Sequence, residues 1–138
     1  MAVMDDSFDP SFGEAWTTSQ CAGLLPMPGV WLMLAWVERE VAGFALSRSV
    51  AGEAELLLLA VRRRDQGRGL GKTLLEAFMN ASRDRGATHL HLEVREGNHA
   101  ARLYEQAGFS VVGRRRHYYT GRDGQLHDAL TLARPALV

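Results

Sequence analysis

The sequence has almost no cysteine and no excess charge of either sign. Its 138 residues include one cysteine, Cys21, and the 16 Lys and Arg residues balance the 16 Asp and Glu residues. A single cysteine excludes a disulfide framework within the chain and fits a reducing cytosol, so we expect Cys21 to be a small buried residue. A neutral domain without interleaved basic and aromatic residues is a poor nucleic-acid binder, and no direct nucleic-acid binding is expected.

Long apolar runs are also missing. The longest, Leu56–Val61, is far too short to cross a membrane, and the acidic start of the chain carries no signal-peptide pattern. The chain is 46% hydrophobic and has no repeat and no linker rich in proline, glycine or serine. Residues 1–138 are therefore predicted to form one domain with its own core. We expect this domain to work in the cytoplasm.

A glycine-rich segment between a predicted strand and a predicted helix is the most informative feature that is present. Leu56–Val61 indicates a buried strand, and a helix with one apolar face begins near Leu70 and ends at Gly86. The first backbone amides of a helix have no intrahelical partners, and the helix dipole favours negative charge beside them. The segment therefore predicts a phosphate-binding loop.

The loop combines three alternating glycines with basic side chains. These residues are Gly67, Gly69, Gly71, Arg68 and Lys72, with further arginines at 62–64. A Walker A loop would need glycine at position 66, which is Gln66, and the dinucleotide fingerprint would need glycine at position 72. Both nucleotide motifs are thus excluded. The arginines are expected to serve an anionic ligand, and a surface turn without a ligand is the alternative.

The spacing Gln-x-x-Gly-x-Gly over Gln66, Gly69 and Gly71 resembles the pyrophosphate loop of the GNAT family, the Gcn5-related N-acetyltransferases. A second block supports the resemblance, because Leu-Glu-Val-Arg ending at position 95 is followed by Asn98 and by Leu-Tyr-Glu-x-x-Gly-Phe ending at position 109. Downstream, segments 115–119 and 128–130 are similar to the RimI-type subfamily. That subfamily acetylates the N-terminal alanine of a small-subunit ribosomal protein.

The resemblance implies an α+β fold, an α/β/α sandwich in which helices flank a mixed, mostly antiparallel sheet. The residue patterns predict strands near 31–38, 41–50, 56–61, 88–94, 109–116 and 128–134, and helices ending near 25, beginning near 70 and covering 99–107. Family members usually carry a first strand and a first helix before the segment that starts here at about Phe8. Either these elements are absent or the true start lies upstream. The answer affects the acceptor site, because the first helices help to form it in the family.

The resemblance also assigns binding residues. Acetyl-CoA is the implied co-substrate, and its contacts would be Leu59, Ala60, Val61, Gln66, Gly67, Arg68, Gly69, Leu70, Gly71, Lys72, Asn98 and Tyr104. The acceptor would contact Trp16, His91, Tyr118 and Tyr119. The implied partner is a protein N-terminus, with ribosomal protein favoured, and the chain would act as a monomer or weak dimer without a membrane.

Two side chains can carry the chemistry of acetyl transfer to an amine. An α-amine, with a pKa of about 7.7–8.0, is roughly a tenth neutral at pH 7 and needs only modest help from a base. Glu93 shares a strand face with His89 and His91. The resemblance implies that its position faces the acceptor amine, which makes Glu93 the candidate base, and a solvated carboxylate is the alternative. Tyr104 is the implied acid for the departing thiolate, and a packing aromatic is its alternative. The implied oxyanion donor is a backbone N–H near Val61.

Two details test this assignment. His89, His91 and Glu93 could form a row of metal ligands, but metal sites generally gather ligands from several elements, so no metal is expected. The RimI-type pattern separates its glutamate and tyrosine by twelve positions, whereas eleven separate Glu93 from Tyr104. If Asn98 stays the helix cap, Tyr104 rotates by about 100°. If Gly97 absorbs the difference, which its conformational freedom favours, Tyr104 stays aligned.

Three functions are therefore weighed. An N-terminal α-amine acetyltransferase is favoured over a transferase for small amines, which would need an acidic acceptor site where this chain offers Trp16, Tyr118, Tyr119 and arginines. A module that binds acetyl-CoA without turnover is the third.

Overall fold

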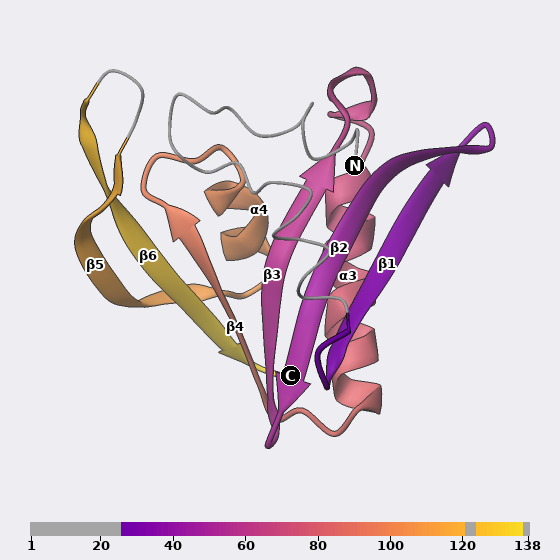
Figure 1. Ribbon diagram of the computed structural model, residues 1–138, viewed down its shortest axis with the longest axis horizontal. Coiled ribbons are helices and arrows are strands. Elements are labelled where there is room, and N and C mark those ends of the chain that lie inside the picture. Colours follow the sequence, from indigo (N-terminus) through magenta and orange to yellow (C-terminus); the bar gives the residue numbers. More distant parts are fainter. Residues whose placement is uncertain (1–25, 121–123, 137–138) are drawn as a thin grey trace.

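The computed structural model describes residues 26–120 and 124–136. In these residues one six-stranded mixed sheet carries two α-helices (Figure 1). The elements are β1 (Val30–Val37), β2 (Glu40–Val50), β3 (Glu53–Val61), the 3-10 turn η2 (Arg63–Asp65), α3 (Leu70–Asp84), β4 (His89–Arg95), α4 (Ala101–Gln106), β5 (Ser110–Thr120) and β6 (Leu126–Pro135). The order across the sheet is β1-β2-β3-β4-β6-β5, and only β3 and β4 pair in parallel. The expected fold class is thereby confirmed.

The predicted strands and helices are present where the described residues can be compared, with different ends. β3, β5 and β6 are longer than expected, because backbone pairing with their neighbours continues through polar positions such as Glu53 and Thr120. The helix expected from position 99 begins at Ala101 instead. Asn98 precedes it in a turn, where its side-chain oxygen accepts a hydrogen bond from the Ala100 amide (2.8 Å). The helix expected to end near 25, and Trp16 with it, lies outside the described residues.

The main core lies between the sheet and α3. Four apolar residues of one helix face, Leu74, Leu75, Phe78 and Met79, are buried in one cluster with apolar residues of β2, β3, β4 and β6. Figure 1 shows α3 running along β1, β2 and β3, while α4 lies near the end of β4. A smaller cluster on the opposite face of the sheet contains Phe44, Leu46, Leu58 and Ala60. Neither helix in the described part of the chain is long and apolar enough to cross a membrane.

Candidate active site

The candidate site begins at an irregularity in β3. Leu46 and Ser47 of β2 pair with Leu58 and Leu56, which leaves Leu57 as one extra residue in β3. This β-bulge exchanges the faces of the strand: before it the even-numbered residues pack with α3, and after it they belong to the opposite cluster. A bulge bends a strand and increases its twist. β3 therefore turns away from β4 at this point.

The bend opens the sheet between its two parallel strands. β3 and β4 pair only where Glu53–Leu56 faces His89–Leu92. Beyond these residues the strands diverge like the arms of a V (Figure 1), and Leu57–Val61 has no pairing partner on β4. A cavity of about 570 Å³ occupies the opening. An edge of β3 that would otherwise be paired thus offers its backbone groups to a ligand.

The cavity brings together many of the residues that the sequence suggested. Its lining includes Leu59, Ala60, Val61, Gln66, Gly71, Glu93, Asn98, Tyr104 and Tyr119. Other predicted site residues do not line the cavity: Gly67, Arg68, Gly69, Leu70, Lys72, His91 and Tyr118. The first five of these are neighbours in sequence of the lining residues Gln66 and Gly71. Residues that sequence reasoning missed include Glu55, Arg95, His99 and Leu103. The sequence contained an indication for Glu55, because this residue alternates with apolar residues at the start of β3 and so belongs to the opposite face of the strand.

The start of α3 has the properties of an anion site. Gly69 occupies the N-cap position with φ of 82°, no side chain caps the helix, and its first turn contains no acidic residue. The first intrahelical hydrogen bond joins the Thr73 amide to the Gly69 carbonyl (3.0 Å). A side chain at Gly67 or Gly69 would point into open space. The amides of residues 70–72 therefore precede the helical ladder and are available to an anionic ligand.

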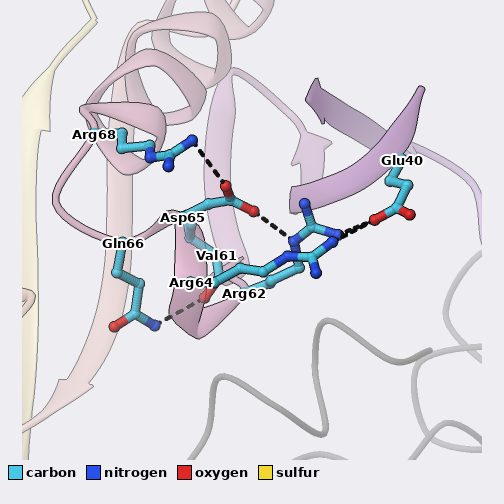
Figure 2. A network of polar contacts seen from close by, with 7 residues as sticks. All are labelled: Glu40, Val61, Arg62, Arg64, Asp65, Gln66 and Arg68. Atoms are coloured by element: carbon cyan, nitrogen blue, oxygen red, sulfur yellow. Dashed lines mark hydrogen bonds and ion pairs between the residues drawn. The ribbon is translucent and has the colours of Figure 1, made fainter. Parts of the chain in front are cut away.

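A network of ion pairs fixes the segment that leads into this loop (Figure 2). The carboxylate of Asp65, a residue only 2% exposed, accepts a hydrogen bond from Arg62 Nε and lies 3.4 Å from Arg68 Nη1. Glu40, the first residue of β2, accepts hydrogen bonds from Arg62 (2.6 Å) and Arg64. The hydrogen bond from Arg62 lowers the pKa of Glu40. These arginines were expected to serve the ligand, whereas the structure pairs three of them with carboxylates.

Glu93 and Tyr104 line the same cavity from different elements. Glu93 lies on the face of β4 away from α3 and its side chain is 24% exposed. Tyr104 comes from α4, is 7% exposed, and its ring packs edge-to-face on Phe109 at 6.2 Å. Between them Gly97 adopts a φ of 88°, a conformation that favours glycine. The short loop between Glu93 and Tyr104 thus contains a residue in the left-handed conformation.

A second network ties the β5–β6 hairpin to the loop after β4. β5 carries extra residues between Arg115 and Tyr119, and His117 has a φ of 53°. The His117 amide donates to Asp128 Oδ1 (2.9 Å), and Arg114 donates to Asp128 Oδ2 (2.6 Å) and to Glu96. The backbone hydrogen bond from His117, followed by that from Arg114, lowers the pKa of Asp128. Asp128 therefore holds the irregular part of β5 in place.

This network predicts a pH-dependent contribution to stability. Asp128 has a folded-state pKa below its usual 3.8, so its stabilisation is complete above the unfolded pKa and is lost as pH falls through the folded pKa. We expect Asp128→Asn to be less stable than the parent at pH 7 and 5, and the difference to shrink as the pH falls below the usual 3.8. Urea unfolding at pH 7, 5 and 3 measures it. A difference of the same size at pH 3 would show that the ionised carboxylate does not stabilise the hairpin.

Metal binding finds no support in the described ranges, where no three His, Cys, Asp or Glu side chains gather around a common point. His91 lies 3.8 Å from Glu55 and lines a separate small hollow with Arg48, Val50 and Glu53. A parallel strand pair that opens beside a glycine-rich helix start is the arrangement of the N-acetyltransferase fold, and comparison with known proteins agrees with this class.

The chain belongs to the acetyltransferase (GNAT) family, whose sequence profile matches residues 2–109. Ribosomal protein bS18-alanine N-acetyltransferase of Haemophilus influenzae is 38% identical over 94 residues, which are 68% of this chain and 64% of that protein. The enzyme of that name from Haemophilus ducreyi is 36% identical over 142 residues, covering 95% of this chain and 98% of its own length. The match thus spans less than two thirds of the first relative and nearly all of the second.

Solved structures give the same result. The crystal structure of the ribosomal-protein-S18-alanine N-acetyltransferase from Escherichia coli superposes with a TM-score of 0.88 at 31% identity, covering 99% of this chain and 85% of that one. The resemblance to the GNAT family and its RimI-type members that the sequence motifs indicated is therefore confirmed.

Proposed function

We propose that this chain is an acetyl-CoA-dependent N-acetyltransferase that modifies the N-terminal α-amine of a protein, with the alanine of a small-subunit ribosomal protein as its preferred acceptor. The observation that carries the proposal is that Glu93 and Tyr104 line one cavity at the opened edge of β3. The choice of acceptor is based on the relatives that are named as bS18-alanine N-acetyltransferases. An enzyme with this acceptor would work in the cytoplasm.

The residues around the cavity fit acetyl-CoA. The uncapped start of α3, without an acidic residue in its first turn, suits a pyrophosphate, with Gln66, Gly67, Arg68, Gly69, Leu70, Gly71 and Lys72 around it. The edge of β3 at Leu59 and Ala60, which faces the opening away from β2, suits the amide groups of an extended pantetheine chain. Val61 and Asn98 line the cavity beside it. When bound, acetyl-CoA supplies the acetyl thioester and leaves as a thiol.

The positions of residues around the cavity support a proposed catalytic role for each of them. Glu93 accepts the proton that the acceptor's ammonium group must lose before its nitrogen can attack, directly or through water. A backbone N–H near Val61 donates to the carbonyl oxygen as negative charge develops on it. The Tyr104 hydroxyl donates a proton to the departing sulfur as the C–N bond replaces the C–S bond. Of the acceptor contacts, Tyr119 lines the cavity, and His91 and Tyr118 remain proposals.

Thiol release from acetyl-CoA with three acceptors in parallel tests this proposal. The acceptors are a peptide with a free N-terminal alanine, an N-blocked peptide that contains lysine, and spermidine. We expect release with the first peptide to be far faster than with either of the other two acceptors. Release with spermidine alone would replace the proposal with a small-amine transferase. No release, together with a rise in melting temperature on addition of acetyl-CoA, would leave a binding module.

A further inference from the structure

We propose that Arg115 selects the acceptor: it pairs with Glu93 when no acceptor is bound, and gives way to an amine that is followed by a peptide carbonyl. The inference rests on the proposed function, because it takes Glu93 as the group that receives the amine. Its starting observation is that Arg115 Nε lies 3.4 Å from Glu93 Oε2. No local pattern predicts this contact, since β6 lies between the two strands that carry the residues.

The register of three strands explains how the two side chains meet. Glu93 of β4 pairs with Thr131 of β6, and Arg115 of β5 pairs with Ala129 of β6. Paired residues, and residues two apart on one strand, share a face of a sheet, so these four lie on the same face. Thr131 and Ala129 are small, and the β5 partner of Thr131 is Gly113. Because the side chains on this face of β6 are small, Arg115 can extend across the strand to Glu93.

Arg115 is placed to change partners. Its side chain is 60% exposed, and its guanidinium carbon also lies 5.0 Å from the centre of the Tyr118 ring. Tyr118 belongs to the irregular part of β5 that Asp128 holds through the His117 amide. Partly exposed ion pairs of this kind are weak. An incoming ammonium can therefore take over Glu93 while the guanidinium remains beside the Tyr118 ring.

Arg114 provides the contrast within the same strand. Two carboxylates, Glu96 and Asp128, engage it at once, and its hydrogen bond to Asp128 is the first cause of the rise in its pKa. Arg114 is thus fixed in the wall of the hairpin. Within the described part of the chain, the carboxylate paired with Arg115 is Glu93, which is the one that the acceptor needs.

The charges around the cavity decide which amines benefit from the exchange. Two carboxylates line it, Glu55 and Glu93, together with the buried Arg95, and Arg115 stands beside Glu93. In a peptide N-terminus, a carbonyl oxygen lies three bonds from the amine nitrogen. This oxygen can accept a hydrogen bond from the displaced guanidinium. A polyamine has no such oxygen, and its second ammonium would meet the positive charge of Arg115. Arg115 therefore favours peptide α-amines and rejects polyamines.

Steady-state kinetics of the full chain with an N-terminal alanine peptide and with spermidine test the inference. We expect Arg115→Gln to lower kcat/KM for the peptide about tenfold, mainly through a higher KM, and to raise kcat/KM for spermidine. Arg115→Lys keeps the positive charge, so it should still reject spermidine while restoring only part of the peptide KM. The neighbouring exposed residue supplies the matched control, since Arg116→Gln should leave the ratio of the two kcat/KM values unchanged.

The outcomes separate this inference from the function on which it rests. Equal changes for both acceptors, or the same change in ratio with Arg116→Gln, would overturn the role of Arg115 and leave the transferase proposal intact. If the parent chain acetylates neither acceptor, both proposals fail together. The melting temperature of Arg115→Gln is measured in the presence of acetyl-CoA to detect a loss of stability. If it is lower than that of the parent, Arg115→Lys, which retains the charge and most of the side-chain length, separates the loss of stability from the loss of selectivity.

Discussion

Replacing Glu93 with glutamine is expected to lower kcat/KM for an N-terminal alanine peptide about 100-fold near pH 6.5, and by progressively less as the pH rises. Below its pKa of about 7.7–8.0 the α-amine is mostly an ammonium ion, which must lose a proton before it attacks. Above that pH the acceptor is already neutral in solution, so the base has little left to do. Rates measured at intervals between pH 6 and 9.5 give the profile.

A second carboxylate in the cavity makes this experiment sharper. Glu55 also lines the opening, but it stands in the paired part of β3, 3.8 Å from His91. Glu55→Gln should keep the pH profile of the parent, and both variants should bind acetyl-CoA with the parent's affinity. An equal loss for Glu93→Gln at every pH would argue against a base at Glu93. A pH-dependent loss in Glu55→Gln alone would move that role to Glu55.

No side chain caps the start of α3, where Gly69 occupies the N-cap position with a φ of 82°. This backbone conformation favours glycine, and a glycine N-cap costs the helix only roughly a few tenths of a kcal/mol relative to Ser, Thr, Asp or Asn. A carboxylate at that position would also occupy the site where a phosphate can bind. The missing cap is therefore consistent with a ligand that completes the helix start, and the glycines at 67 and 69 keep the approach open.

The sequence predicted the features that depend on local patterns. Alternation along residues 88–94 placed Glu93 on the face of β4 away from α3, and the glycine spacing placed the glycine-rich segment at the start of α3. The bulge at Leu57 could not be predicted in this way. Four leucines in a row have no alternation, so nothing in Leu56–Val61 marks where the strand exchanges its faces.

Contacts between distant strands were beyond prediction for a different reason. The pairing of Arg115 with Glu93 depends on the register of β5, β6 and β4 together, and a slip of one residue would place Arg115 on the other face. Asp65 stands within an arginine-rich run, and its burial between Arg62 and Arg68 depends on the folded positions of all three residues. Such networks become visible only once the fold brings their members together.

Replacing Tyr104 with phenylalanine is expected to lower kcat about 100-fold without weakening acetyl-CoA binding. The substitution removes only the hydroxyl, which would no longer protonate the departing sulfur. The ring, buried against Phe109 at a centroid distance of 6.2 Å, keeps its packing. Single-turnover rates and the affinity for acetyl-CoA, measured on one preparation, separate the two effects.

The ring partner of Tyr104 supplies the control for packing. Phe109 is buried in the same core cluster as Tyr104, so Phe109→Leu should lower the melting temperature through lost contacts and leave the hydroxyl in place. If Tyr104 acts as an acid, Tyr104→Phe loses turnover at an almost unchanged melting temperature, while Phe109→Leu loses stability and keeps most of its turnover at low temperature. If Tyr104 only packs, Tyr104→Phe should retain the parent rate, because the eleven-residue spacing from Glu93 would then have turned the hydroxyl away from the sulfur.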